Sequence, residues 1–481
     1  MNNVEQQKLK KMKIISKTIK LLPLFLMALV ITSCSDDDDY GGAPIPPPEL
    51  NIVQLAVATD DLSSLVAALQ AADGDLVTVL SGSGPFTVLA PTNAAFATFL
   101  SDNSFASLDD VPTDVLNQVL LNHVISGDVS STDLVGLGSG YTRTNATGAG
   151  GNTMSLYFDT SDGVVFNNVS TVETPDVVAS NGTIHIVDAV IGLPSIVDHA
   201  LNNPNFSALA NALVLEDLVT TLQGDGPFTV LAPTNAAFSD FTNPNSNTLS
   251  SILLNHVLSG AITSADLAAL GNTYANTLAT GPNDSALSLY SNTDDGVRFN
   301  GVSSVAIADV IGTNGIIHAV DGVIDLPTIV TFALANPNLS SLVASLAEAD
   351  GSAADPMLIP TLSGDGPFTV FAPLNSAFTT LLDSNPAWTT PADIDDALLN
   401  SVLTHHVLNG NNRAESLTDG MMVSTLEGDM ITINLPGNDG NAGKITDGSG
   451  NTDIDIVLTN VQAINGVVHA VETVLIPDTT N

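Results

Sequence analysis

Apolar and polar positions along the chain follow a pattern that occurs three times. Residues 84–96 read GPFTVLAPTNAAF, and close copies stand at 226–238 and 366–378. Within the first copy, residues 86–90 are mostly apolar, which predicts a buried strand. Pro91 ends that strand, and the residues after it predict a helix. The copies begin 142 and then 140 residues apart, so they indicate whole domains rather than short solenoid repeats.

The helix after each strand needs a residue that caps its first turn. Thr92 and Asn93 can provide this cap in the first copy, because both side chains accept hydrogen bonds from backbone N–H groups. In the third copy Leu374 replaces the threonine, so we predict that Asn375 caps the helix there. The asparagine occurs in all three copies, as Asn93, Asn235 and Asn375, and we expect it to be structural.

A second shared block predicts the end of a helix. It reads LLNHVISG, LLNHVLSG and LTHHVLNG, in which apolar residues at helical spacing lead to a glycine that suits a helix C-terminus. This spacing places one histidine of each copy on the apolar stripe. We therefore expect hydrogen-bonded core histidines, with a role in partner contact as the alternative. These residues are His123, His256 and His406.

The third shared block reads NGTIHIVDAVIGLP at residues 181–194, with copies that begin at Asn314 and Asn465. Its β-branched residues and the preceding Asn-Gly turn predict a strand. The histidine and the carboxylate in each copy stand three residues apart, so a strand points them to opposite faces and they cannot share a metal ion. We expect structural hydrogen bonds at His185, His318 and His469.

These ordered blocks, present in three copies from about residue 50 to 477, resemble the fasciclin-like domain family. The resemblance implies an α+β fold, in which each of three tandem domains is a β-wedge or sandwich with packed helices. It also implies adhesion and contact with extracellular matrix. The expected domains are 49–194, 195–327 and 328–477.

One position departs from the pattern of the family. Many fasciclin-like domains carry a tyrosine before the helix-end histidine, and that pair has been linked to receptor adhesion. In this chain the preceding residues are Asn122, Asn255 and His405. This departure argues against integrin-type recognition.

The N-terminus has the pattern of an export signal. Six lysines precede an apolar run at residues 21–31, which is too short to span a bilayer and suits the core of a signal peptide. The run leads to Ile-Thr-Ser-Cys34, which resembles a bacterial lipobox. We therefore predict a signal peptide at 1–33, lipidation of Cys34, and an acidic, Pro-rich tether at 34–48. Cys34 is the only cysteine, so no disulfide forms within one chain.

Charge narrows the class of partner. Residues 34–481 contain four basic and 50 acidic residues, a formal charge of −46. Such a surface repels nucleic acid and anionic lipid headgroups. We expect membrane attachment through the lipid at Cys34, and an extracellular protein or polysaccharide as partner. The four aspartates after Cys34 resemble the signal that sends Bacteroidetes lipoproteins to the cell surface. This predicts an outer-membrane location facing outward, with the periplasmic face as the alternative.

The sequence contains no nucleophile elbow, HExxH pair, P-loop or Rossmann glycine pattern, so we expect no enzyme activity and no cofactor. Residues 447–455 place oxygen-bearing side chains at alternate positions, as a calcium-binding loop does. Thr452 and Leu458 stand where such a loop needs glycine and glutamate, which favours a polar hairpin turn. The weak calcium candidates are Asp447, Asn451, Asp453 and Asp455.

Taken with the resemblance, these features predict a lipid-anchored adhesion protein that makes cell–cell, matrix or glycan contact. The alternative is an envelope carrier lipoprotein that holds a glycan fragment or a lipophilic small molecule. A large apolar cavity with a few polar groups would favour the carrier.

Overall fold

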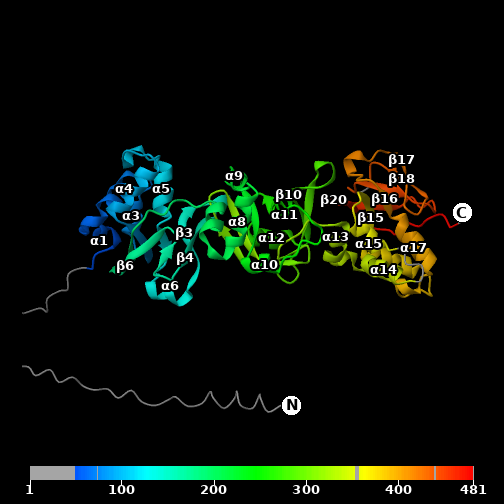
Figure 1. The fold of residues 1–481 in the computed structure, drawn as a ribbon, viewed down its shortest axis with the longest axis horizontal. Helices are drawn as coiled ribbons and strands as arrows, with labels where there is room; N and C mark the ends of the chain where they lie inside the picture. Colours follow the sequence, from blue (N-terminus) through cyan, green and yellow to red (C-terminus); the bar gives the residue numbers. More distant parts are fainter. Residues whose placement is uncertain (1–48, 73, 353–356, 438–439, 480–481) are drawn as a thin grey trace, which may run out of the picture. The chain divides into compact units, whose positions relative to one another are not determined.

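The computed structural model describes residues 49–72, 74–352, 357–437 and 440–479 (Figure 1). The predicted signal peptide, Cys34 and the tether up to residue 48 lie outside the described residues. Three units of similar element order follow one another, and we call them repeat 1, repeat 2 and repeat 3. No single helix among the described residues is long and apolar enough to cross a membrane, although two bent helix pairs qualify by length and composition.

Repeat 1 begins with short helices and ends in strands. Its first helix is capped by Asn51, whose side chain accepts a hydrogen bond from the backbone N–H of Gln54. The bounds are α1 (Ile52–Ala58), α2 (Ser63–Ala71), α3 (Leu76–Leu80), β1 (Phe86–Pro91), α4 (Asn93–Asp102), α5 (Thr113–Leu121), β2 (Val124–Ser126), α6 (Ser131–Leu137), β3 (Ser139–Thr147), β4 (Thr153–Asp159), β5 (Val165–Phe166), β6 (Ser170–Ala179) and β7 (Gly182–Val187).

Repeat 2 follows the same order and begins with a capping box at Ser195. The bounds are α7 (Ile196–Asn202), α8 (Ser207–Leu215), α9 (Val219–Leu222), β8 (Phe228–Pro233), α10 (Asn235–Asp240), α11 (Leu249–Leu254), β9 (Val257–Ser259), α12 (Ser264–Leu270), β10 (Thr273–Thr280), β11 (Ala286–Asn292), β12 (Arg298–Phe299), β13 (Ser303–Ile311) and β14 (Gly315–Val320).

Repeat 3 keeps this order but has only a short 3₁₀ turn at Ala414–Ser416 where repeats 1 and 2 have α6 and α12. The bounds are α13 (Ile329–Ala335), α14 (Ser340–Gly351), α15 (Leu358–Ser363), β15 (Phe368–Pro373), α16 (Asn375–Asp383), α17 (Asp396–His405), β16 (Val407–Asn409), β17 (Met421–Ser424), β18 (Met430–Asn434), β19 (Gly443–Thr446), β20 (Ile454–Ala463) and β21 (Gly466–Val471).

The three shared sequence blocks supply three neighbouring strands in each repeat. In repeat 1 the strand order is β2-β1-β7-β6-β5-β4-β3, and β1 pairs antiparallel with β2 and parallel with β7. Repeat 3 has the equivalent order, and in repeat 2 β9 also pairs with β10, which closes the strands into a barrel. The predicted α+β fold with three tandem domains is confirmed.

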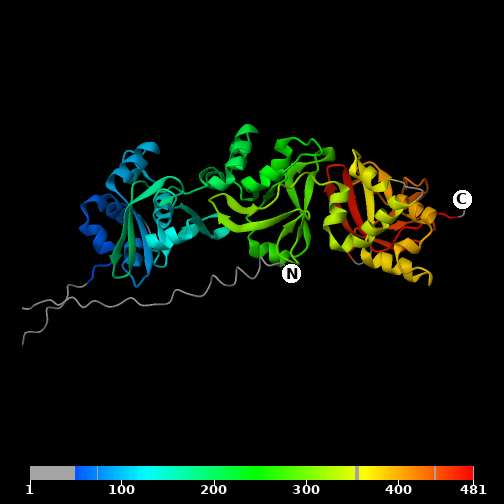
Figure 2. The ribbon, with the colours of Figure 1, turned by 60° about the horizontal axis from the view of Figure 1, so that its bottom comes forward.

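Apolar residues on both faces of the central strand explain why its sequence is a continuous apolar run. Val88 and Ala90 of β1 pack into the cluster formed with the helices, whereas Leu89 packs into a second cluster among the strands. Burial on both faces replaces the simple apolar–polar alternation of an exposed strand. Figure 2 shows the equivalent layering in repeat 3, where the yellow helices lie over the red strands.

The helix caps agree with the sequence in two repeats and differ in the third. Thr92 Oγ1 accepts a hydrogen bond from Ala95 N at 3.2 Å, and Thr234 makes the same bond with Ala237. The prediction that Asn375 caps α16 is wrong. Leu374 holds the N-cap position without a side-chain hydrogen bond, because Asn375 already lies inside the helix and its side chain turns toward α14.

Candidate functional site

The three helix-end histidines are buried and make the same two hydrogen bonds. His123 Nδ1 lies 2.7 Å from Val119 O, and its Nε2 accepts from Ile191 N at 2.9 Å. Because Nε2 accepts an N–H, the ring is neutral with its hydrogen on Nδ1. Burial lowers the pKa of His123 and of His256 to about 4, and that of His406 to about 3. The equivalent Nε2 acceptors serve Ile324 N and Leu475 N, both at 2.9 Å.

The three histidines of the third shared block lie on β7, β14 and β21, where the sequence predicts a strand. His185 Nε2 lies 2.9 Å from Val129 O, and its Nδ1 accepts from Asp176 N at 3.2 Å. His318 makes the same pair of bonds with Ile262 O and Asp309 N. His469 Nε2 lies 3.0 Å from Asn412 O. These rings tie the last strand of each repeat to the loop that follows β2, β9 or β16.

The shared asparagine after the first strand joins two helical segments. Asn93 Oδ1 accepts from Ser64 N at 2.7 Å, and its Nδ2 donates to Asp60 O at 3.0 Å. Asn235 and Asn375 make the equivalent bonds, with acceptor distances of 2.9 Å to Ala208 N and Ser341 N. Each asparagine therefore caps the preceding long helix of its repeat rather than its own helix.

A fourth shared residue was not among the candidates from the sequence. Asn181 Oδ1 accepts from Ile52 N at 2.9 Å, and its Nδ2 donates to Leu80 O and Gly82 O. Asn314 and Asn465 repeat this set of three bonds. The sequence signal for this residue is the Asn-Gly pair that begins the third shared block in all three copies. We interpreted that pair only as a turn.

The calcium candidates lie in and beside the turn between β19 and β20, and the structure divides them into two groups. Asp447 accepts hydrogen bonds from Asn451 N at 2.9 Å and from Ile476 N at 2.9 Å. Asp453 and Asp455 instead face the ammonium of Lys444, at 2.6 Å and 3.9 Å. The hydrogen bond from Lys444 lowers the pKa of Asp453. The segment thus forms the polar hairpin turn that the sequence favours.

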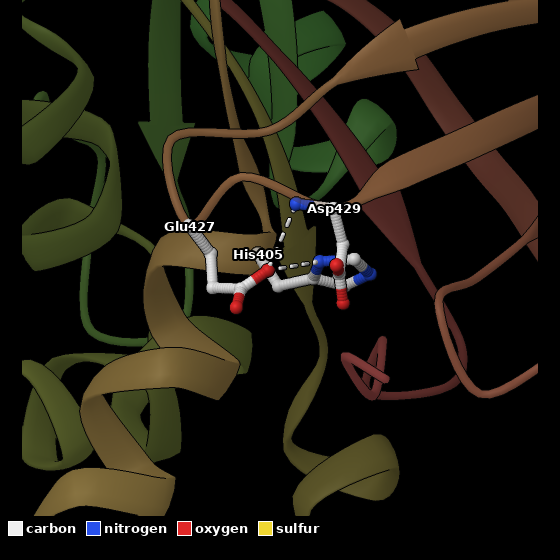
Figure 3. A group of neighbouring side chains, drawn as sticks. All are labelled: His405, Glu427 and Asp429. Atoms are coloured by element: carbon white, nitrogen blue, oxygen red, sulfur yellow. Dashed lines mark hydrogen bonds and ion pairs between the residues drawn. The ribbon is translucent and has the colours of Figure 1, made fainter. Parts of the chain in front are cut away.

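Among the described residues, repeat 3 alone carries a group of three titratable side chains close enough to share a metal ion. His405 is fully buried and stands where repeats 1 and 2 have Asn122 and Asn255. Its Nδ1 lies 3.5 Å from Glu427 Oε2, and ligand atoms of His405, Glu427 and Asp429 lie within 4.8 Å of one another (Figure 3). Burial lowers the pKa of His405, while the charge of Glu427 acts in the opposite direction.

The hydrogen bonds of His405 favour a structural role over a metal site. Its Nε2 accepts from Gly448 N at 3.2 Å, so the hydrogen of the neutral ring stands on Nδ1, the atom that faces Glu427 Oε2 and Thr425 Oγ1. A metal ion among these carboxylates would need the lone pair of that Nδ1. The ring instead connects α17 with the turn between β19 and β20, as Asn122 connects α5 with Gly192 O.

Equivalent side chains join each repeat to the next. Ser155 Oγ of repeat 1 accepts from Ile311 N of repeat 2 at 2.9 Å, and Ser288 Oγ of repeat 2 accepts from Gln462 N of repeat 3 at 3.0 Å. Asn203 Nδ2 donates to Tyr141 Oη at 3.1 Å. Asn336 makes the same bond with Tyr274 at 3.1 Å. We call these two regions joint 1–2 and joint 2–3.

The cavities beside two of the helix-end histidines are small. The cavity beside His406 has a volume of about 30 Å³, and the one beside His123 about 20 Å³, each room for a water molecule or two. A larger cavity of about 270 Å³ lies at joint 2–3, with Tyr274, Tyr290 and Asn336 in its wall. Among the described residues, the places that can hold a ligand therefore lie at joints and surfaces rather than at the shared motif.

The fold and its internal hydrogen bonds define a tandem array of three α+β domains. A model of the fasciclin domain family matches residues 60–194, 204–327 and 339–477, and the chain belongs to this family. One similar solved structure is a FAS1 domain pair from the insect cell adhesion molecule fasciclin I. The FAS1 domain pair of that molecule aligns with 55% of this chain and 96% of its own, with a TM-score of 0.36 and 20% identity.

Two relatives illustrate the range of similarity. The pig transforming growth factor-beta-induced protein ig-h3 is 27% identical over 374 residues, which are 74% of this chain and 49% of that protein. Protein sll1483 of Synechocystis is 40% identical over 142 residues, which are 30% of this chain and 73% of that protein. The chain thus spans about half the length of ig-h3.

Proposed function

We propose that this protein is a bacterial adhesion protein, anchored by a lipid on Cys34 and facing outward from the outer membrane. Residues 1–33 are its signal peptide, residues 34–48 form the tether, and domains 49–194, 195–327 and 328–477 present the contact surface. The observation that carries the proposal is the series of three fasciclin domains. Three domains in one chain also suit adhesion, because several weak contacts add up when the target repeats.

The hydrogen bonds of the shared residues support a particular form of this proposal. The six shared histidines bond to backbone groups of their own repeat, and so do the asparagines that cap the long helices. Because these shared residues are used inside each repeat, we expect the partner to contact surfaces that differ from repeat to repeat. Those surfaces carry a large excess of acidic groups, so the partner is an extracellular protein or a polysaccharide without strong negative charge.

The joint cavity supports a second candidate, a carrier that holds a glycan fragment. The cavities beside His406 and His123, at about 30 and 20 Å³, are too small for a lipophilic molecule, whereas a cavity of about 270 Å³ in repeat 3, lined mostly by apolar residues such as Trp388 and Leu398, has room for one. The 270 Å³ cavity at joint 2–3 combines tyrosines and amides with an apolar wall. These groups suit a small polar ligand with apolar faces.

The proposal is tested in the source organism by protease treatment of intact cells combined with an attachment assay. We expect wild-type protein to be cleaved at the surface, and a deletion strain to lose attachment to surfaces or to neighbouring cells. A Cys34→Ala strain should lose membrane-bound protein and attachment together, whereas the matched Ser35→Ala strain keeps lipidation. Protein that stays protected from protease, in cells whose attachment survives deletion, would overturn the proposal and favour the periplasmic carrier.

A further inference from the structure

The cavity at joint 2–3 is built from both neighbouring repeats. Repeat 2 contributes residues of β10 and β11, and repeat 3 contributes the segment after α13 together with parts of β15, β20 and β21. Strand β11 of repeat 2 and strand β20 of repeat 3 contact each other at this joint. The volume of about 270 Å³ is slightly below the roughly 300 Å³ at which drug-sized ligand pockets begin. A ligand of one or two sugar rings matches that size class better than a larger molecule.

The lining of this cavity is uncharged. It consists of tyrosine, asparagine, threonine and aliphatic side chains, without any aspartate, glutamate, lysine or arginine. The chain has 51 acidic residues, so an uncharged wall in an accessible cavity stands out from the rest of the surface. A charged ligand would find no ion-pair partner there and would lose its hydration. The lining therefore selects for a neutral ligand.

The polar groups of the cavity are held in fixed positions. Asn336 Nδ2 donates to Tyr274 Oη at 3.1 Å, and the Tyr290 hydroxyl donates to Asn336 Oδ1 at 3.3 Å. The hydroxyl hydrogen of the partly exposed Tyr274 remains for a ligand, whereas Tyr290 is fully buried and holds Asn336 in place. Burial raises the pKa of Tyr274 to about 12, so its hydroxyl stays neutral. Asn338 is exposed at the cavity, and its side-chain amide forms no hydrogen bond with the described residues.

An apolar surface faces these polar groups. Leu374 and Val457 are partly exposed, and Leu458 keeps 39% of its surface accessible. The rings of Tyr274 and Tyr290 lie 4.9 Å apart, centroid to centroid. A sugar ring has hydroxyl groups at its edge and C–H groups on its faces, so it can bond to the amide and hydroxyls while its face covers apolar carbon.

Joint 1–2 has the same arrangement of tyrosine and asparagine side chains, but the residues that pack beside them differ. Tyr141, Tyr157 and Asn203 correspond to Tyr274, Tyr290 and Asn336, and Asn205 corresponds to Asn338. However, Phe206 takes the place of Leu339, and Thr234 that of Leu374. Phe206 is fully buried in the core of repeat 2 and is larger than the leucine. Joint 1–2 therefore provides matched control positions within the same molecule.

We propose that the cavity at joint 2–3 is a binding site for a neutral saccharide, with Asn338 and Tyr274 as hydrogen-bonding groups and Leu458 as part of the apolar wall. This inference rests on the proposed function, because it names glycan as the partner class and assigns one site for it. The fixed Tyr–Asn–Tyr arrangement means that little side-chain order has to form on binding.

The test uses the purified full chain and ligand-observed NMR. The probes are methyl glycosides of glucose, galactose, mannose and N-acetylglucosamine, with methyl glucuronide as the charged comparison. We expect saturation transfer to at least one neutral glycoside and a weaker signal for the glucuronide. Asn338→Ala should weaken binding about threefold to tenfold, the effect of one lost hydrogen bond, and the matched Asn205→Ala should leave it unchanged.

A second variant tests the cavity itself. Leu339→Phe installs the residue that repeat 2 already carries, so the fold can accept it, and we expect the larger ring to abolish saccharide binding. Equal weakening by Asn205→Ala and Asn338→Ala would overturn the assignment, as would no binding of any neutral glycoside. If the wild-type chain binds no neutral glycoside but the deletion strain loses attachment, this site alone is refuted. Intact saccharide binding with unchanged attachment after deletion refutes the adhesion function instead.

Discussion

His123 Nε2 accepts a hydrogen bond from the backbone N–H of Ile191 at 2.9 Å, which joins the end of α5 to the segment after β7. The two residues are 68 positions apart in the chain. His256 with Ile324 and His406 with Leu475 repeat the same connection. Because each bond links the middle and the end of a repeat, it stabilises the closed interior of that repeat rather than a neighbouring one.

The neutral state of these rings makes the protein sensitive to mild acid. The folded pKa of His256 is about 4, below the unfolded value of 6.5, so the unfolded state binds more protons between these values. The stability that depends on the neutral His256 ring is therefore fully present above pH 6.5, and it falls as the pH drops toward 4. At pH 5 we expect a loss of about 2 kcal/mol for each such histidine. Urea unfolding measured from pH 7.5 to 4.5 checks this.

A His256→Asn variant separates this effect from carboxylate titration. The variant is less stable at pH 7, but its unfolding free energy should depend less on pH between 6.5 and 4.5, by about one proton. The carboxylates with lowered pKa, such as Asp393 at about 2, act at lower pH. An unchanged pH slope in the variant would show that His256 does not titrate on unfolding.

Removal of a helix-end ring should be costly. In His256→Ala, Ile324 N loses its acceptor inside the core, and Ile252 O loses its donor. We expect a loss of about 3 kcal/mol in the unfolding free energy of repeat 2, measured by urea denaturation. The exposed control Leu270→Ala should change it by less than about 0.5 kcal/mol. A loss below 1 kcal/mol for His256→Ala contradicts the structural role.

The N-cap of α4 gives a smaller and more local effect. Thr92→Ala removes the acceptor for Ala95 N, so we expect a loss of about 1 kcal/mol in unfolding free energy. Thr92→Ser keeps the hydroxyl and should retain most of that energy. The comparison by thermal unfolding separates the hydrogen bond from the missing methyl group. If the serine variant loses as much as the alanine variant, packing of the threonine methyl outweighs the cap.

The sequence predicted the strands and the core histidines because their signals are local. The apolar run at Phe86–Pro91 and the histidines of β7, β14 and β21 fall within single elements whose periodicity can be followed directly. The cap at Asn375 was predicted wrongly for the same reason. The choice between its own helix and α14 depends on which neighbour packs beside it, and spacing along the chain does not contain that information.

The joints could not be predicted because their partners lie far apart in sequence. Ser155 and Ile311 are 156 residues apart, and both fit unremarkable strand patterns. Likewise, His405 was recognised only as a departure from the family pattern. Its link to Gly448 depends on how the turn between β19 and β20 folds back on α17.

The serines at the joints should couple the unfolding of neighbouring repeats. Ser288→Ala leaves Gln462 N, which is fully buried, without an acceptor, so we expect about 1 to 3 kcal/mol less stability at joint 2–3. Ser155→Ala should do the same for Ile311 at joint 1–2. Differential scanning calorimetry should then resolve repeat 3 as a separate, earlier transition in the Ser288 variant and repeat 1 in the Ser155 variant. The exposed control Ser376→Ala should keep the wild-type profile. An unsatisfied buried N–H group should weaken a rigid joint. An identical profile for all three variants would therefore mean that the serine hydrogen bonds do not couple the unfolding of neighbouring repeats.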